Sequence, residues 1–298
     1  SEGTLGLTLA ANGVTDTAGN TGPASAASSS TITIDRTGPV LTLAQAAGQA
    51  DPARTSPINF TLSGNETILA SSVVASEFTV TNGTIGTISC SGSSCTIPVT
   101  PSGQGDVSIA PSGTFSVTDP SGNAATTASG TDRTVTYDTV VPTATVTAPA
   151  SPTNATSPTF TVTFSETVSG LAAGDFTTSG TATGCVIGTP SAASGTSMTV
   201  SITSCSEGTL TLTLAANGVT DAAGNTGPAA ASASSALTID RTAPTVTISS
   251  GPTGTVSATT ASIAFTTTDG TTQCNLDSGS WSSCTSPVSY SSLSDGSH

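Results

Sequence analysis

The chain has 298 residues, of which 7% are charged and 3% aromatic, and 18 acidic against 4 basic side chains give a formal net charge of −14. This balance excludes nucleic acid as an expected partner, because lysine and arginine must neutralise the phosphates and the chain has no lysine. The apolar runs are only a few residues long, so no membrane insertion is expected in this segment.

An internal repeat organises the chain from its first residue. SEGTLGLTLAANGVTDTAGNTGPA at 1–24 returns at 206–229 with changes only at Gly6/Thr211 and Thr17/Ala222. A second phrase recurs as TIDRTGPV at 33–40, TYDTVVPT at 136–143 and TIDRTAPT at 238–245. Its aspartates are 103 and 102 residues apart (138 − 35 and 240 − 138). A period near 100 residues fits one β-sandwich per repeat, whereas solenoid repeats run about 20–50 residues.

Strand signals within 143–240 have the spacing of an immunoglobulin-type sandwich. Seven short alternating segments (TATVTAP, PTFTVTF, GDFTTSG, GCVIG, SMTVSIT, TLTLTLAA and SALTID) are separated by Gly, Pro, Ser and Asn. We therefore predict an all-β chain of tandem immunoglobulin-like β-sandwich modules in an elongated array. The predicted ranges are a partial module at 1–35 with strands F and G only, complete modules at 36–140 and 141–242, and a partial module of a related subtype at 243–298 with strands A–E.

The first and last residues fall at the same phase of the repeat, because SDGSH at 294–298 is equivalent to SEGT. Two interpretations remain open. The segment is a window in a longer polypeptide, or the N-terminal F–G hairpin of one copy completes the open C-terminal module of the next copy.

The phrases FSETVSGLAAGDFTTSG, VTDAAGNTGPA and TIDRTAPTVTI resemble the bacterial Ig-like repeats of giant extracellular adhesins and surface fibre proteins. The resemblance implies an extended stalk on the cell surface, calcium at module junctions, and neighbouring modules or copies of the same protein as partners. It also implies an unknown cell-surface ligand bound elsewhere in the parent chain.

Acidic residues recur at one predicted pole, where the incoming linker, the end of strand B and the F–G turn meet. Hard cations such as calcium prefer six to eight oxygen ligands of this kind. The three predicted metal sets are Asp35, Glu66 and Asp119; then Asp138, Glu166 and Asp221, with Asn225; then Asp240 and Asp269, where the F–G turn is absent.

Two other interpretations compete with calcium. D-x-x-G-N is also good type I turn chemistry, so the aspartates could simply cap turns. Arg36 and Arg241 follow Asp35 and Asp240 directly and could neutralise them.

The six cysteines fall into three close pairs, Cys90/Cys95, Cys185/Cys205 and Cys274/Cys284. One pair per unit, with no catalytic C-x-x-C motif, favours disulfides and an oxidising, extracellular compartment over free buried thiols. The spacings differ, so the pairs are expected to staple different places and not to form the inter-sheet bridge of antibody domains.

Catalysis finds no support in the sequence, because the one histidine is terminal and no nucleophile has a base. The chain is therefore not expected to be an enzyme. The leading hypothesis is an adhesin stalk stiffened by disulfides and junctional calcium. The alternative is a self-assembling extracellular filament. A lectin-like module is the weakest hypothesis, because only Trp281, Tyr137 and Tyr290 offer a suitable aromatic surface.

Overall fold

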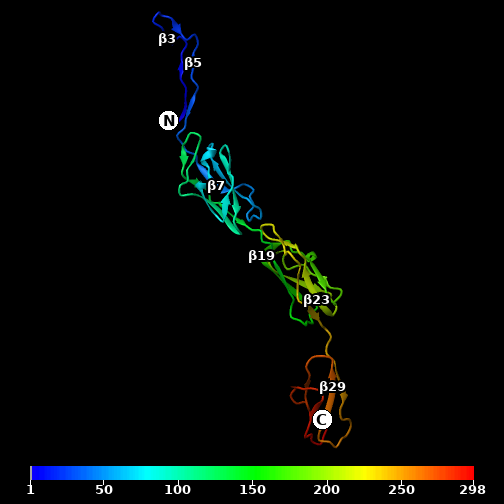
Figure 1. Ribbon diagram of the computed structural model, residues 1–298. Coiled ribbons are helices and arrows are strands. Elements are labelled where there is room, and N and C mark those ends of the chain that lie inside the picture. The colour runs from blue at the N-terminus through cyan, green and yellow to red at the C-terminus, as the bar shows by residue number, and fades with distance from the viewer. Residues whose placement is uncertain (1) are drawn as a thin grey trace.

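The computed structural model describes residues 2–298; Ser1, the first residue of the predicted 1–35 segment, lies outside the described residues. Strands dominate, joined by loops and three short 3-10 helices, at Ala70–Ser72 (η1), Ala75–Glu77 (η2) and Ala173–Asp175 (η3). The predicted all-β sandwich fold is confirmed. In Figure 1 a hairpin, two sandwiches and a smaller C-terminal unit follow one another in chain order. Among the described residues, no helix has the length and apolar character needed to cross a membrane.

The first sandwich packs a larger sheet, of strand order β10-β12-β8-β7-β16 with β11 on β12, against the sheet β17-β13-β9. Its core includes Leu43, Phe60 and Ile97, which are fully buried. The sequence of β8 explains this burial, since its apolar residues alternate with polar ones and therefore all lie on the face toward the core. The strands are β7 Leu41–Gln45, β8 Ile58–Gly64, β9 Phe78–Thr81, β10 Gly83–Ile85, β11 Ser89–Ser91, β12 Ser94–Pro101, β13 Gly105–Pro111, β14 Val117–Thr118, β15 Ala124–Ala125, β16 Ala128–Ser129 and β17 Thr134–Tyr137.

The second sandwich repeats this plan around a separate core that includes Phe160, Met198 and Leu212. One sheet has the order β21-β22-β19-β24-β25 with β18 on β19, and the other contains β20, β23, β26 and β27. All seven segments expected from the sequence are strands. They are β18 Ala144–Thr147, β19 Thr159–Ser169, β20 Phe176–Ser179, β21 Val186–Ile187, β22 Ser194–Thr203, β23 Gly208–Leu214 and β27 Leu237–Ile239, and the additional strands are β24 Val219–Thr220, β25 Thr226–Gly227 and β26 Ser232–Ala233.

The connection between β23 and β27, expected to be a simple turn, is itself built from short strands. The hairpin β24–β25 crosses to the opposite sheet, where Thr220 pairs with Ser169 at the end of β19. Strand β26 then returns to pair with β23. The F–G connection therefore ties the two sheets together at one pole.

The N-terminal segment has strands at the positions of this F–G region, 205 residues earlier, except that two strands, β1 and β2, stand where β23 is continuous. It consists of β1 Gly3–Leu5, β2 Thr8–Leu9, β3 Val14–Thr15, β4 Thr21–Gly22, β5 Ala27–Ser28 and β6 Ile32–Ile34, which pair as β1–β6, β2–β5 and β3–β4. The near-identical sequences thus adopt the same hairpin in both places.

The C-terminal unit has one three-stranded sheet, β28-β29-β32, and a small hairpin, β30–β31. Its strands are β28 Val246–Ser250, β29 Ala261–Thr267, β30 Gln273–Cys274, β31 Ser282–Ser283 and β32 Val288–Tyr290. These correspond to the early strands predicted for 243–298, so within the described residues this unit has no counterpart of β23 and β27.

The six cysteines form three disulfides, paired as the sequence predicts. Cys90 and Cys95 lie directly opposite each other on β11 and β12. The other two bridges close segments with sequence separations of 20 and 10 residues. Each bridge is a local staple inside one unit.

We expect the Cys185–Cys205 bridge to stabilise its sandwich more than Cys90–Cys95 stabilises the other, because it closes the longer loop. The loop-entropy model gives about 3 kcal/mol for the former and about 2 kcal/mol for the latter. Calorimetry of the double Cys→Ala variants of each pair checks this. One cysteine of each pair is buried, so the truncations are matched, and an equal or reversed loss would contradict the entropic account.

Candidate functional site

Two groups of carboxylates meet at equivalent poles of the two sandwiches. One oxygen each from Asp35, Glu66 and Asp119 lie within 4.8 Å of one another. The same holds for a second group, Asp138, Glu166 and Asp221. Two of the three predicted metal sets are therefore brought together, each from a linker, the B-strand region and the F–G connection. We call them the first and second carboxylate clusters.

The F–G aspartate of each cluster is held rigidly by its own loop. Oδ1 of Asp221 accepts a hydrogen bond from the Asn225 backbone at 2.8 Å, and Oδ2 accepts one from the Asn225 side chain at 2.9 Å. Asp119 and Asn123 repeat this arrangement at 2.9 Å for both bonds. Asp119 is 1% exposed and Asp221 is 5% exposed. The loop therefore does cap a turn, as the competing interpretation required, and it also fixes a buried carboxylate at the pole.

The glutamate of the second cluster reaches the pole through an irregularity in β19. The pairing of β19 with β22 changes register between Thr163 and Val168, so Glu166 lies in the bulged part of the strand. Bulges commonly redirect side chains in this way. Since Ser169 pairs with Thr220, the residue directly before Asp221, the crossing of β24 brings the two acids together.

The linker is fastened to the same pole. The side chain of Asn225 donates to the carbonyl of Asp138 at 3.0 Å, and the backbone N–H of Val140 donates to Asp138 Oδ1 at 2.9 Å. Pro142 approaches Gly227 so closely that a Cβ there would stand 2.4 Å from the proline carbonyl. The glycine of the repeated AGNTG phrase thus permits the close approach of the linker.

The pKa values of the two cluster glutamates are raised. Burial raises the pKa of Glu166, and the charges of Asp138 and Asp221 add to the rise. Glu66 behaves in the same way, its pKa raised by burial and then by Asp35, Asp119 and Glu2.

Asp119, the F–G aspartate of the first cluster, has a pKa shifted in the opposite direction. Burial pushes the pKa of Asp119 upward, but the hydrogen bonds from Asn123, Ser121 and Gly122 outweigh this effect and leave the pKa below its usual value. Each cluster thus combines a fixed aspartate with a glutamate whose charge is disfavoured by burial and by its acidic neighbours.

Neutralisation by arginine, the other competing interpretation, is not what the structure has. In residues 2–298, no guanidinium nitrogen of an arginine lies within 4.0 Å of a carboxylate oxygen. The guanidinium of Arg241 instead donates to the carbonyls of Cys205 and Ala155, each at 2.9 Å. The two clusters therefore lack a protein cation that would balance their charge.

The third predicted set, Asp240 and Asp269, has only two acids and belongs to neither cluster of three. Asp240 accepts the backbone N–H of Thr242 at 3.0 Å, while Asp269 sits in the loop after β29. Asp16, the N-terminal equivalent of Asp221, is exposed.

Two polar side chains of the first sandwich, missed by the sequence analysis, reach toward the second cluster. The guanidinium of Arg54 donates to the carbonyl of Gly224 in the F–G loop of the next sandwich. Gln104 accepts the backbone N–H of Thr139, in the linker, at 3.0 Å. The repeat gave no signal for Arg54, because the equivalent position in the next sandwich is Ala155.

Comparison with known proteins supports the fold of the second sandwich. Residues 138–239 match the family model described as "Bacterial Ig-like domain". The matched range begins at the linker aspartate and contains all three acids of the second cluster. No curated protein matches the chain.

We predict that Glu166→Gln stabilises the second sandwich at pH 7 in the presence of a chelator. A carboxyl whose folded pKa is raised destabilises the fold as pH rises from its ordinary value, 4.5, through the folded pKa, because the unfolded state then ionises more readily. The advantage of the variant should therefore shrink as the pH falls below 4.5. Module-resolved hydrogen exchange between pH 4 and 8 measures it.

The control for this prediction is Asp132→Asn, which removes an exposed acid outside the clusters. A Glu166→Gln variant that is less stable than the wild type at pH 7 without cations would contradict the repulsion between the three acids.

Proposed function

We propose that this chain is a mechanical spacer in a secreted bacterial surface protein, the stalk of an adhesin, whose junctions are stiffened by calcium. The observation that carries the proposal is the assembly of acids from the linker, the B-strand region and the F–G loop into one carboxylate cluster at each of two poles. A cation held there would connect the linker to the sandwich that follows it.

The residues fit a hard cation by their chemistry. All three side chains of each cluster offer carboxylate oxygens, the ligands that calcium prefers. Asp35, Glu66 and Asp119 would hold one ion, and Asp138, Glu166 and Asp221 the other. Burial and then the charges of the neighbouring acids raise the pKa values of both glutamates, and a divalent cation bound beside them would favour their ionised form.

An extracellular location is supported by the disulfides. Three bridges and no free cysteine among the described residues are typical of proteins that mature in an oxidising compartment. The bacterial Ig-like match at 138–239 agrees with a structural repeat of this kind. We propose neighbouring modules of the same protein as the mechanical partners, with adhesion to a cell-surface ligand located elsewhere in the parent chain.

Calcium chloride should raise the thermal stability of both sandwiches relative to a chelator. Binding to the native state alone contributes about 2.7 kcal/mol at a ligand concentration one hundred times Kd. Glu166→Gln should abolish the calcium response of the second sandwich and leave that of the first, while Glu66→Gln should do the reverse. Calorimetry combined with module-resolved hydrogen exchange measures both responses.

The calcium proposal fails if neither sandwich responds to the ion, or if Asp132→Asn weakens the response as much as the cluster variants do. The direction of the stability change also distinguishes a lost binding site from a generally weakened fold. Glu166→Gln is expected to stabilise the second sandwich without calcium and to lose only the stability that calcium adds.

The stalk proposal predicts an extended particle in which Arg54 limits bending between the two sandwiches. Small-angle scattering of the full chain should give a maximum dimension far above that of a globule of equal mass. Arg54→Ala removes the bond to the Gly224 carbonyl and should broaden the distribution of interatomic distances. Arg133→Ala is the matched control, and a compact wild-type particle would contradict the stalk.

A further inference from the structure

The linker of residues 138–143, which joins the two sandwiches, is bonded to the sandwich that it leaves. The N–H of Asp138 donates to the carbonyl of Ala53 at 2.8 Å. The N–H of Thr139 donates to Gln104 Oε1 at 3.0 Å, and Gln104 Nε2 donates in turn to the Thr139 hydroxyl at 2.5 Å. Gln104 lies directly before β13, so both polar atoms of one side-chain amide hold the start of the linker to the first sandwich.

The same linker is also bonded to the sandwich that it enters. The N–H of Thr143 donates to Ser165 Oγ at 3.0 Å, and the N–H of Ser165 donates back to the Thr143 carbonyl at 3.1 Å. The N–H of Val140 is bonded inside the linker, and Pro142 has no N–H. In the described part of the chain, the N–H of Val141 is therefore the only one of this linker without an acceptor.

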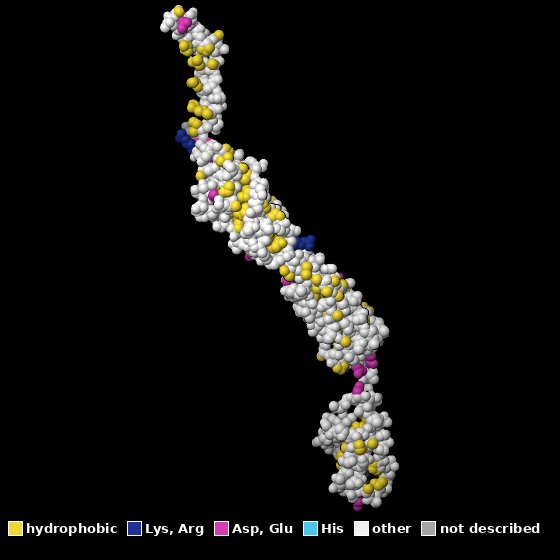
Figure 2. Space-filling model, in the orientation of Figure 1, with side chains coloured by type: hydrophobic (Ala, Val, Ile, Leu, Met, Phe, Trp, Pro, Cys, Tyr) yellow, Lys and Arg dark blue, Asp and Glu magenta, His cyan; other side chains and the backbone are white. Residues whose placement is uncertain are grey.

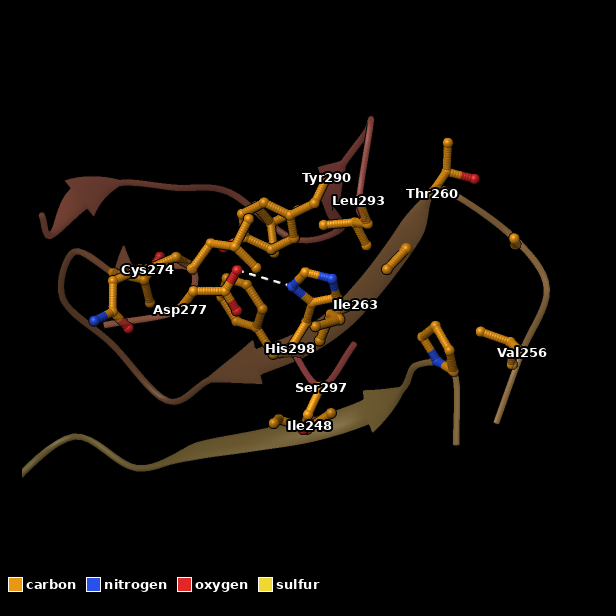
Figure 3. A pocket seen from close by; sticks show the side chains of 18 of the residues that line it. Ile248, Val256, Thr260, Ile263, Cys274, Asp277, Tyr290, Leu293, Ser297 and His298 are labelled. Carbon is orange, nitrogen blue, oxygen red and sulfur yellow. Dashed lines mark hydrogen bonds and ion pairs between the residues drawn. The ribbon is translucent and has the colours of Figure 1, made fainter. Parts of the chain in front are cut away.

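The next linker, residues 240–245, forms the same four bonds from N–H groups 102 residues further along the chain. The donors and acceptors are Asp240 to the Thr153 carbonyl at 3.0 Å, Arg241 to Glu207 Oε1 at 2.7 Å, Thr242 to Asp240 Oδ1 at 3.0 Å, and Thr245 to Thr268 Oγ1 at 2.9 Å. Glu207 takes the place of Gln104, and it also accepts the Thr242 hydroxyl. This linker leads to β28, the strand that carries Ile248 in Figure 3. Two linkers of different sequence thus form one arrangement.

Proline stiffens the part of each linker that lacks these bonds. Val141 precedes Pro142, and Ala243 precedes Pro244 at the equivalent position. Proline fixes its own φ and restricts the preceding residue to extended conformations. Few backbone angles of either linker are therefore free to change while its hydrogen bonds are intact.

We propose that these bonds make each linker a rigid connector without any cation, and that Gln104 and Glu207 are the positioning residues that hold it. Both side chains belong to the sandwich behind the linker, whereas each carboxylate cluster lies on the sandwich ahead of it. The linker acid of a cluster is thus fixed before a cation binds, because the next residue in the chain is already bonded. This stiffness goes beyond the proposed function, since it requires no calcium.

The contact between the two sandwiches agrees with a fixed junction. Figure 2 shows no gap between them, and the guanidinium of Arg54 crosses from the first sandwich to the Gly224 carbonyl of the second. Rotation about the linker would have to break this bond as well as those that hold the linker at its two ends.

Amide hydrogen exchange of the full 298-residue chain, in buffer with chelator, tests the linker directly. The N–H groups of Thr139, Val140 and Thr143 should be protected, whereas that of Val141 should exchange as an open amide does. Gln104→Ala should lower the protection of Thr139 about fivefold, the usual net effect of one hydrogen bond. The amides of β8 and β12 in the core of the same sandwich should be unchanged.

Gln104→Glu is the rescue variant. A glutamate keeps the acceptor for the Thr139 N–H, as Glu207 does for Arg241, so the protection of Thr139 should return to the level of the wild type. Gln273→Ala, which truncates an exposed glutamine on β30, is the matched control and should leave the linker unchanged.

Residual dipolar couplings in the same buffer measure the effect on the junction. One alignment tensor should describe both sandwiches of the wild type. The double variant Gln104→Ala/Ser165→Ala, which frees both ends of the linker, should give the two sandwiches tensors of different magnitude. Both residues are outside the buried core, so the sandwiches should fold as in the wild type.

A wild type whose sandwiches align independently in chelator would overturn the proposal. So would unchanged protection of Thr139 in Gln104→Ala, or a Gln104→Glu variant that behaves as Gln104→Ala does. Because no calcium is present, each of these results would leave the proposed metal clusters untouched, and a chain that binds no calcium would leave the linker bonds standing.

Discussion

Burial of the alternating leucines of β23 against the opposite sheet is the interaction on which the rest depends. Leu210, Leu212 and Leu214 fix the F strand in the core, and the connection that follows must then cross the pole to reach β19. That crossing delivers Asp221 to Glu166 and to the linker. The core and the carboxylate cluster are therefore consequences of one hairpin, and a unit that lacks the hairpin lacks both.

Only 7% of the residues are charged, yet six of the acids lie in two clusters where they repel one another. Arginine, the only strong cation available, bonds main-chain carbonyls at the poles, as Arg54 and Arg241 do, and leaves the acids unbalanced. Hydrogen bonds from Asn225 hold Asp221 in place despite its neighbours. Such a pole costs stability when no cation is bound, and under the calcium proposal a bound cation would offset that cost.

Much of this architecture could be predicted from the repeat. The period located the strands and placed the acids of two clusters correctly, because their spacing follows the fold of each sandwich. The crossing of β24 onto β19 was missed, since Val219–Thr220 is too short to show an alternating pattern. Arg54 was missed because its partner is a carbonyl in another sandwich, 170 residues away, which no residue type reveals. The third set stays a prediction, because Asp240 and Asp269 are only two acids and belong to neither cluster of three.

The N-terminal segment shows which part of a cluster is local. The side chain and backbone of Asn20 donate to Asp16 and lower the pKa of its carboxyl, just as Asn225 donates to Asp221. The loop therefore fixes its aspartate by contacts between residues four apart. The approach of the linker and glutamate acids depends instead on the crossing that ties the two sheets together, so the complete cluster is a property of the folded sandwich.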